Sequence, residues 1–159
     1  MAKSEAEKLE QRAKNILLFQ LSRSMKTRYQ LAEVLKRREI PDQIANQVLD
    51  RFTEAQLIDD SVFTGAFVRS RLEAGRSAMA IRQDLARKGV SQDLITSAVG
   101  QINQEQEQEI ADRLAAVRYQ RMLKLEPEVR QRRLLGFLQR RGFSQAIAYR
   151  AIRKASSQG

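Results

Sequence analysis

The sequence predicts an all-α protein made of tandem three-helix repeats that join end to end in an elongated, curved molecule. Apolar residues recur one helical turn apart, and no stretch shows the alternation of Val, Ile and Thr that marks a β-strand. Only two prolines and seven glycines interrupt the 159 residues. One pattern of apolar residues also occurs three times along the chain, which indicates repeated helical units.

The repeat is visible when residues 31–52, 81–102 and 134–155 are aligned. Eight of the 22 aligned positions are apolar in all three copies, whereas chance at this composition gives roughly two. The apolar positions lie one turn apart, stop at a corner and then resume, so each copy is predicted to be a helix, a corner and a second helix. In the first copy the eight positions are Leu31, Leu35, Ile40, Ile44, Ala45, Val48, Leu49 and Phe52.

The corner has a sequence signature of its own. Gly89 and Gly142 match the left-handed residue that ends many helices, and the first copy has Glu39 at this position. Cationic pairs precede both glycines, where they suit the negative end of a helix dipole. Ser91 and Ser144 then match the N-cap of the following helix. The corner is therefore predicted to have a structural role: once in each repeat, it ends one helix and starts the next.

Helix-start signals mark most of the remaining elements. The first helix is expected to end before Thr27, whose "TRYQ" has the form of a capping box, and Pro41 suits the first turn of the third helix. In "LIDDSVF", Asp59 or Asp60 would start the next helix, and Ser77 would open the helix after it. We interpret the two adjacent carboxylates as a cap rather than as acid catalysts or metal ligands.

The last module begins in the polar segment "QINQEQEQE", residues 101–109. Gln and Glu are good helix formers, and no Gly or Pro lies between Gly100 and Pro127, so we expect a helical junction with some hinge freedom. A helix through residues 105–125 should stop near Pro127, which can start the next helix. The plan is three modules of three helices each: the first module, 1–55; the middle module, 56–104; and the last module, 105–159.

Composition excludes most catalytic chemistry. The chain has no Cys and no His, which removes disulfides, thiolate chemistry, cysteine zinc sites and the usual general base. We therefore assign no catalytic residue, metal or cofactor, and expect a protein that is not an enzyme. There is no run of about 18 apolar residues and no apolar signal-peptide core, so we expect a cytoplasmic protein that does not enter a membrane.

Positive charge is concentrated in the last third of the chain. Residues 113–159 hold 12 Lys or Arg against two Glu, a net charge of +10, while residues 1–112 hold 17 residues of each sign. This asymmetry indicates an anionic partner. Arginine outnumbers lysine ten to two in this segment, which favours bidentate recognition of phosphates or carboxylates.

Helical spacing places many of these cations on outer faces of the three predicted helices of the last module. Arg130, Arg133 and Arg140 are expected near one face of the middle helix, with Arg141 beside them, and Arg121 and Lys124 are expected on the first helix. The candidate binding surface consists of Arg113, Arg118, Arg121, Lys124, Arg130, Arg133, Arg140, Arg141, Arg150, Arg153 and Lys154.

Other interpretations of these features are less favoured. A helix, a glycine corner and a helix also form the outline of a DNA-binding helix-turn-helix, but three corners in tandem argue against three groove-reading units. A membrane-surface role is disfavoured because the basic faces lack Trp and the core requires the apolar faces. Four aromatic residues are expected in the core rather than as base-stacking platforms: Phe63, Phe67, Phe137 and Phe143.

With these motifs in place, the chain resembles the RecX family of bacterial recombination regulators over roughly residues 12–155. The resemblance rests on "LIDDSVF", "RKGVSQDLI" and "FLQRRGFSQAIAYRAI", in this order and at these separations. It implies a crescent of three-helix repeats and a regulator that binds the RecA nucleoprotein filament. Such a regulator limits filament growth and suppresses ATP hydrolysis, strand exchange and coprotease activity.

Two hypotheses about function follow. The first is a monomeric protein that docks on a RecA filament and touches acidic side chains and phosphates together. The second is a plain DNA-binding protein that competes for single-stranded or double-stranded DNA. Both would use the basic surface of the last module.

Overall fold

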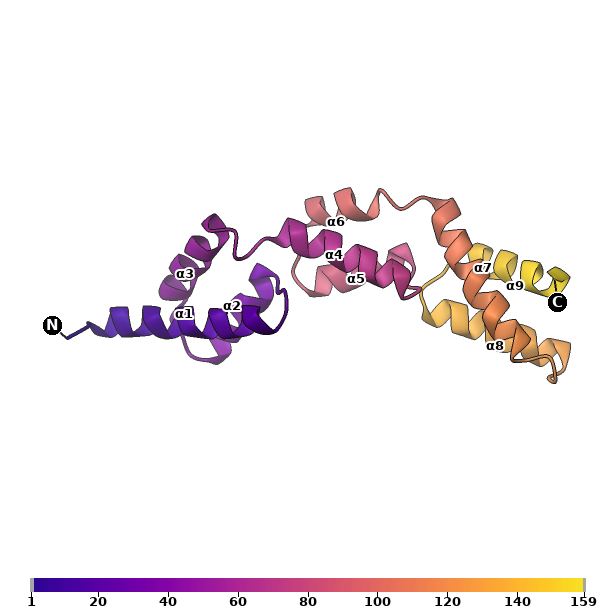
Figure 1. The fold of residues 1–159 in the computed structure, drawn as a ribbon, viewed down its shortest axis with the longest axis horizontal. Coiled ribbons are helices and arrows are strands. Elements are labelled where there is room, and N and C mark those ends of the chain that lie inside the picture. Colours follow the sequence, from indigo (N-terminus) through magenta and orange to yellow (C-terminus); the bar gives the residue numbers. More distant parts are fainter. Residues whose placement is uncertain (1, 159) are drawn as a thin grey trace. The chain divides into compact units, whose positions relative to one another are not determined.

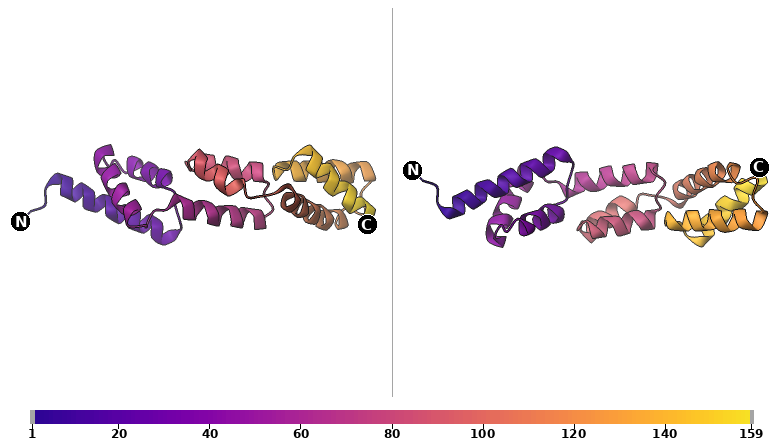
Figure 2. Two further views of the ribbon diagram at one scale, coloured as in Figure 1. Left: turned by 90° about the horizontal axis from the view of Figure 1, so that it is seen from above. Right: turned by 90° about the horizontal axis from the view of Figure 1, so that it is seen from below.

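The computed structural model describes residues 2–158, which form nine α-helices and contain no strand (Figures 1 and 2). The predicted all-α class and the tandem three-helix plan are therefore confirmed. None of the described helices is both long and apolar enough to cross a membrane. The helices are α1 (Glu5–Arg23), α2 (Arg28–Arg37), α3 (Asp42–Glu54), α4 (Asp60–Glu73), α5 (Ala78–Arg87), α6 (Gln92–Val99), α7 (Gln104–Gln120), α8 (Pro127–Arg140) and α9 (Gln145–Gln158).

Most of the predicted helix starts are confirmed by hydrogen bonds. The hydroxyl oxygens of Thr27, Ser77, Ser91 and Ser144 each accept a bond from the backbone N–H three residues further on, at 3.1–3.3 Å. Asp59 caps α4 in the same way, since its Oδ1 accepts the N–H groups of the second and third following residues at 3.0 and 3.2 Å. Such caps satisfy donors that have no partner inside the helix.

Two boundaries in the last module differ from the prediction. The expected helical junction is wrong at residues 101–103, because Asn103 instead caps α7 by accepting the N–H of Gln106 at 2.7 Å. The helix expected to reach Pro127 ends at Gln120. Beyond it, N–H groups bond to carbonyls three residues back, a tighter winding that stops the α-helix.

A smaller difference concerns the first module. Pro41 was expected in the first turn of α3 but lies one residue before the helix. Its φ of −56° and ψ of 142° are not helical, and it provides no side-chain cap because the proline ring has no hydrogen-bonding atom. Pro127, in contrast, is the first residue of α8, as predicted.

All three corners adopt the predicted left-handed conformation, with φ of 61° at Glu39, 78° at Gly89 and 96° at Gly142. In each corner the next residue donates its N–H to the carbonyl five residues back, at 3.0–3.1 Å, for example from Val90 to Leu85. This pair of features defines the Schellman motif, which satisfies the last carbonyls of a helix. The prediction that one corner recurs in every repeat is confirmed.

Glu39→Gly should be neutral or should stabilise the protein by up to about 1 kcal/mol. The left-handed backbone strains Glu39, and glycine removes that strain while making the unfolded chain more flexible. Urea denaturation of the variant and the parent gives the difference in free energy of unfolding. A loss above about 1 kcal/mol would contradict the assignment of strain to this corner.

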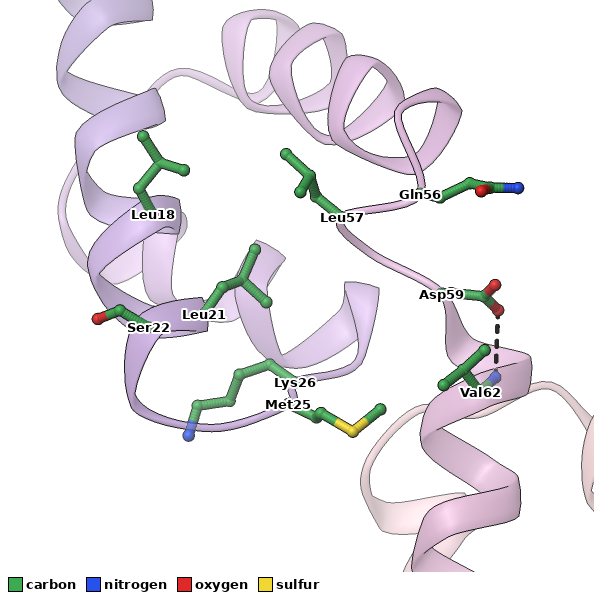
Figure 3. Close-up of a pocket in the computed structure, with 9 residues that line it drawn as sticks. All are labelled: Leu18, Leu21, Ser22, Met25, Lys26, Gln56, Leu57, Asp59 and Val62. Carbon is green, nitrogen blue, oxygen red and sulfur yellow. Dashed lines mark hydrogen bonds between the residues drawn. The ribbon is translucent and has the colours of Figure 1, made fainter.

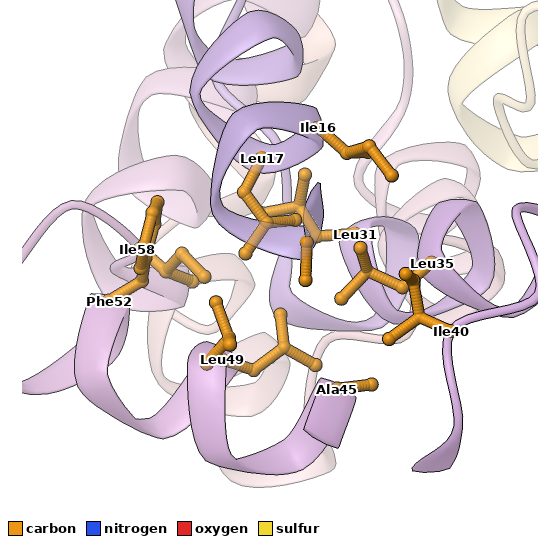
Figure 4. Close-up of a cluster of buried hydrophobic side chains, with 11 residues drawn as sticks. Ile16, Leu17, Leu31, Leu35, Ile40, Ala45, Leu49, Phe52 and Ile58 are labelled. Atoms are coloured by element: carbon orange, nitrogen blue, oxygen red, sulfur yellow. The ribbon is translucent and has the colours of Figure 1, made fainter. Parts of the chain in front are cut away.

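The repeat supplies the core of the protein. In all three copies, every residue at the eight aligned positions is buried or half-buried. Figure 4 shows the cluster in the first module, which consists of Ala13, Ile16, Leu17, Leu31, Leu35, Ile40, Ala45, Val48, Leu49, Phe52 and Ile58. The cluster in the last module consists of Ala111, Ala115, Tyr119, Leu134, Phe137, Leu138, Phe143, Ala148, Ala151, Ile152 and Ala155.

The chain divides into two compact units, and the middle module contributes to both. One unit contains the chain up to Gly65 together with Leu85–Leu94. The other contains Ala66–Asp84 together with the chain from Ile95 onward. Within each unit, the start of one module's second helix packs against the next module, and we call this contact a joint.

In the first unit, the joint connects the start of α2 to the corner after α5 and to the start of α4. The Thr27 hydroxyl donates to the carbonyl of Lys88 at 2.6 Å, and the Arg28 N–H donates to Asp60 Oδ1 at 2.9 Å. The two segments approach so closely that a Cβ atom on Gly89 would lie 2.2 Å from the Cβ of Tyr29. Glycine is therefore required here for space as well as for its positive φ.

The second unit repeats the same joint between α5 and the last module. The Ser77 N–H donates to the carbonyl of Arg141 at 3.1 Å, and the Ala78 N–H donates to Glu107 Oε1 at 3.0 Å. A Cβ atom on Gly142 would lie 2.3 Å from Ser77 Oγ. The glycine corner thus has a second role that local sequence rules do not predict, because the second helix of the preceding module packs against it.

Candidate anion-binding surface

Four arginine side chains gather around one hollow in the last module. Arg118 comes from α7, while Arg132, Arg133 and Arg140 come from α8, and Met122 and Gly136 complete the lining. We call this site the arginine hollow. The hollow is expected to attract anions, because four of the six residues around it are arginines.

The packing of α8 explains why its arginines face outward. Leu134, Phe137 and Leu138 are at most 6% exposed and fix one face of the helix in the core. Arg133 and Arg140 are exposed and lie two turns apart on another face. The sequence pattern of α8 therefore anchors the helix and presents the cations at the same time.

Arg118 is held in place by an aromatic ring. Its Cζ lies 4.0 Å from the ring centroid of Phe137, a close cation–π contact. Phe137 is a buried residue of α8, so this contact connects Arg118 of α7 to the helix that carries the other three arginines. It also restricts the side chain of Arg118 before any ligand binds.

Gly136 contributes space to the arginine hollow. A Cβ atom at this position would lie 3.1 Å from Arg140 Nη1, which is closer than most Cβ contacts. Glycine inside a helix costs roughly 0.5–1 kcal/mol relative to alanine. Its presence in the interior of α8 leaves room for the guanidinium of Arg140 to lie across the helix.

The charges of the arginine hollow are not neutralised within the protein. In the part of the chain that the structure describes, none of its four arginines forms an ion pair. Elsewhere arginines do pair: Arg28 with Asp50 at 2.6 Å, and Arg76 with Asp84 at 3.2 Å. The hollow therefore keeps its attraction for an external anion.

Several predicted surface cations have structural contacts instead. Arg130 is half-buried, with its Cζ 5.2 Å from the ring centroid of Tyr119. Arg141 donates to the carbonyl of Ala74 at 2.7 Å, which supports the joint between α5 and the last module. Lys154 pairs with Asp112 at 3.5 Å. Arg130, Arg141 and Lys154 therefore have partners within the protein, and their role in a binding surface stays a prediction.

The remaining predicted cations lie outside the arginine hollow. Arg121 and Lys124 were expected on the first helix of the last module but follow its end, because α7 stops at Gln120. Arg113, Arg150 and Arg153 are exposed on α7 and α9. None of these five cations lines the arginine hollow.

Sequence reasoning missed Arg132. It lies four residues before Gly136 and eight before Arg140, so all three fall along one face of α8. That spacing could have identified the residue, but the choice between this face and the one containing Arg130 required the position of α7.

The first unit has a second hollow, shown in Figure 3, which we call the apolar hollow because five of its nine lining residues are apolar; the other four are Ser22, Lys26, Gln56 and Asp59. Leu18 and Leu21 come from α1, Met25 from the following loop, Leu57 from the turn after α3 and Val62 from α4. All of these except Leu21 are about half exposed, between 48% and 56%. Apolar side chains exposed together are typical of a surface that contacts another protein.

Comparison with known proteins gives the same three-domain organisation. The models of the first, second and third three-helix domains of RecX match residues 13–52, 59–99 and 104–152. The regulatory protein RecX of Thermobifida fusca is 43% identical over 150 residues, which cover 93% of this chain and 80% of that protein. The RecX of Streptomyces coelicolor is 42% identical over 146 residues, which cover 91% and 78%.

Solved structures agree with this organisation. The crystal structure of RecX from Lactobacillus salivarius matches with a TM-score of 0.80 at 19% identity, covering 95% of this chain and 99% of that one, and so supports the fold. Together, the fold and the surface define a helical-repeat protein with a basic last module, and the relatives that match most of it are named regulatory proteins. The chain belongs to the RecX family, and the resemblance seen in the sequence is confirmed.

Proposed function

We propose that this protein binds RecA nucleoprotein filaments and inhibits or modulates the ATPase, recombinase and coprotease activities of RecA. The observation that carries the proposal is family membership across all three domains, since regulatory proteins named RecX match nearly the whole chain. The protein is proposed to act as a monomer in the cytoplasm, as a regulator rather than an enzyme.

The two hollows support a partner that is both protein and nucleic acid. The arginine hollow suits the phosphates that a filament carries, because its four guanidinium groups form no ion pair with any described residue and favour anions. The apolar hollow suits a protein surface rather than DNA, and it lies in a part of the sequence where the charges balance. A nucleoprotein filament offers both kinds of surface.

The alternative function is a DNA-binding protein that competes with RecA for the strand. The arginine hollow supports this role as well. The helix-turn-helix outline does not strengthen it, because the corners at Gly89 and Gly142 are explained as the sites where modules join. The two functions therefore have to be separated by experiment.

One titration separates them. RecA filaments on single-stranded DNA are mixed with increasing protein, and the ATPase rate is compared with the binding of the protein to bare DNA in the same buffer. A filament regulator should inhibit at concentrations where bare DNA is hardly occupied. Coincident curves, with inhibition removed by excess DNA, would favour the competitor instead.

The apolar hollow provides a variant for the same assay. Leu57→Glu should weaken RecA inhibition, because a charge placed among Leu18, Met25 and Val62 opposes burial against a protein. Folding should survive, because Leu57 is 52% exposed. Binding to bare DNA should change little.

Met79→Glu is the matched control, since Met79 is an exposed apolar residue (61%) outside this hollow. Equal loss of inhibition in both variants would point to a general effect of added negative charge. In that case the apolar hollow would have no special role in contact with RecA.

A further inference from the structure

We propose that the arginine hollow binds adjacent phosphate groups of a nucleic-acid backbone and does not read the bases. This inference rests on the proposed function, and it assigns one part of that function to four residues. Three of them, Arg118, Arg133 and Arg140, belong to the surface predicted from sequence, and Arg132 is added by the structure.

The density of charge favours a nucleic acid over a protein carboxylate. A single carboxylate neutralises one guanidinium and would leave the other cations of the hollow close together and unpaired. Duplex DNA carries one negative charge for about every 1.7 Å of its axis, so several phosphates would come within reach of the hollow at once. Each guanidinium can also donate two parallel hydrogen bonds to one phosphate.

The lining of the hollow favours the backbone over the bases. Stacking of bases requires an accessible aromatic ring. The ring that contacts a cation of the hollow is covered, since Phe137 is 6% exposed beneath Arg118, and so is Tyr119, which is 9% exposed beneath Arg130 outside the hollow. Among the described residues, the hollow is lined by no Asn or Gln, the residues that recognise adenine edges, so base readout here would be limited to guanine, which arginine can recognise. Binding here should therefore be largely independent of base sequence.

The glycine inside α8 indicates a shaped binding site rather than a diffuse basic surface. Gly136 lowers the stability of the helix, and a Cβ atom at this position would lie 3.1 Å from Arg140 Nη1. The position of Gly136 thus allows shape to be tested separately from charge.

The first experiment measures the salt dependence of DNA binding. The full chain carrying Arg132→Gln, Arg133→Gln and Arg140→Gln is titrated onto a labelled duplex and a labelled single strand at several salt concentrations. The slope of log K against log salt should fall by about 2–3 units on duplex, since each lost phosphate contact removes about 0.9. On a single strand each lost contact should remove about 0.7.

The control variant removes the same charge outside the candidate binding surface. Arg12→Gln, Arg37→Gln and Arg38→Gln replace exposed cations of the first module that do not line the arginine hollow. Its salt slope should change by less than about one unit. If both triple variants lose the same slope, binding depends on net charge alone, and the proposal for the hollow is overturned.

The second variant, Gly136→Ala, leaves all charges in place. Alanine should stabilise α8, so the melting temperature should not fall, while the added Cβ, 3.1 Å from Arg140 Nη1, should shift that guanidinium group by a few tenths of an ångström. DNA affinity should fall about fivefold, the equivalent of one weakened charge-assisted hydrogen bond. Unchanged affinity would show that the shape of the hollow has no part in binding.

RecA inhibition, measured on the same proteins, separates this inference from the proposed function. If the arginine variant loses inhibition but keeps the parent's salt slope on DNA, the hollow contacts protein carboxylates and the phosphate proposal is wrong. If the parent does not inhibit RecA beyond its occupancy of DNA, the proposed function is wrong, whatever the salt slope shows.

Discussion

Gly89→Ala should lower the free energy of unfolding by about 3 kcal/mol, which is a large effect for the addition of one methyl group. The new Cβ would lie 2.2 Å from both Cβ and Cγ of Tyr29. These atoms cannot move far without the start of α2, so the joint between α2 and the corner after α5 has to open. The positive φ of 78° adds the strain of a left-handed alanine.

Urea denaturation checks this expectation, and the first corner provides a control. Glu39→Ala exchanges one side chain for another at a φ of 61°, and Glu39 is exposed, so its stability should change by less than about 1 kcal/mol. Gly142→Ala should resemble Gly89→Ala, because its Cβ would lie 2.3 Å from Ser77 Oγ and 2.8 Å from Ala80 Cβ. If all three variants lose the same small amount, the glycines serve only as helix ends and the joint is unimportant for stability.

Arg133→Glu with Arg140→Glu should weaken RecA inhibition by several kcal/mol of binding free energy, because each reversal replaces an attraction with a repulsion. Both side chains are exposed and unpaired within the described part of the chain, so the variant should fold. The concentration that gives half-maximal inhibition of the RecA ATPase measures the first expectation, and circular dichroism of the variant checks that it folds.

The control must reproduce the structural cost of reversing a charge at a helix end, since Arg140 lies in the last turn of α8. Arg37 occupies the aligned position in the last turn of α2. Arg37→Glu with Arg12→Glu changes the charge equally in the first module, outside the strongly basic segment 113–159, and should affect inhibition much less. Lys14 is unsuitable for this control, because it pairs with Glu10 at 3.4 Å. If the Arg133→Glu, Arg140→Glu variant folds and inhibits RecA like the parent, the role given to these two arginines is contradicted.

The amino-acid sequence by itself determined the helices, their caps and their corners. Thr27, Ser77, Ser91 and Ser144 act on N–H groups only three residues away, so their roles depend on local hydrogen bonds. The apolar positions of the repeat were also predictable, because helical periodicity decides which residues share a face. The boundary errors arose where two local signals competed, as at Asn103, which could continue a helix or cap one.

The grouping of the functional residues was decided only by the tertiary structure. Spacing along α8 shows that Arg130, Arg132 and Arg133 point outward, but it does not show which of them meets α7. Packing turned Arg130 onto Tyr119 and left Arg132 and Arg133 beside Arg118. The second role of Gly89 was equally invisible, because Tyr29 lies 60 residues away in sequence and 2.2 Å from the missing Cβ. Contacts between residues so far apart in sequence depend on how whole modules pack together, and local patterns of hydrogen bonding and hydrophobicity carry no information about that packing.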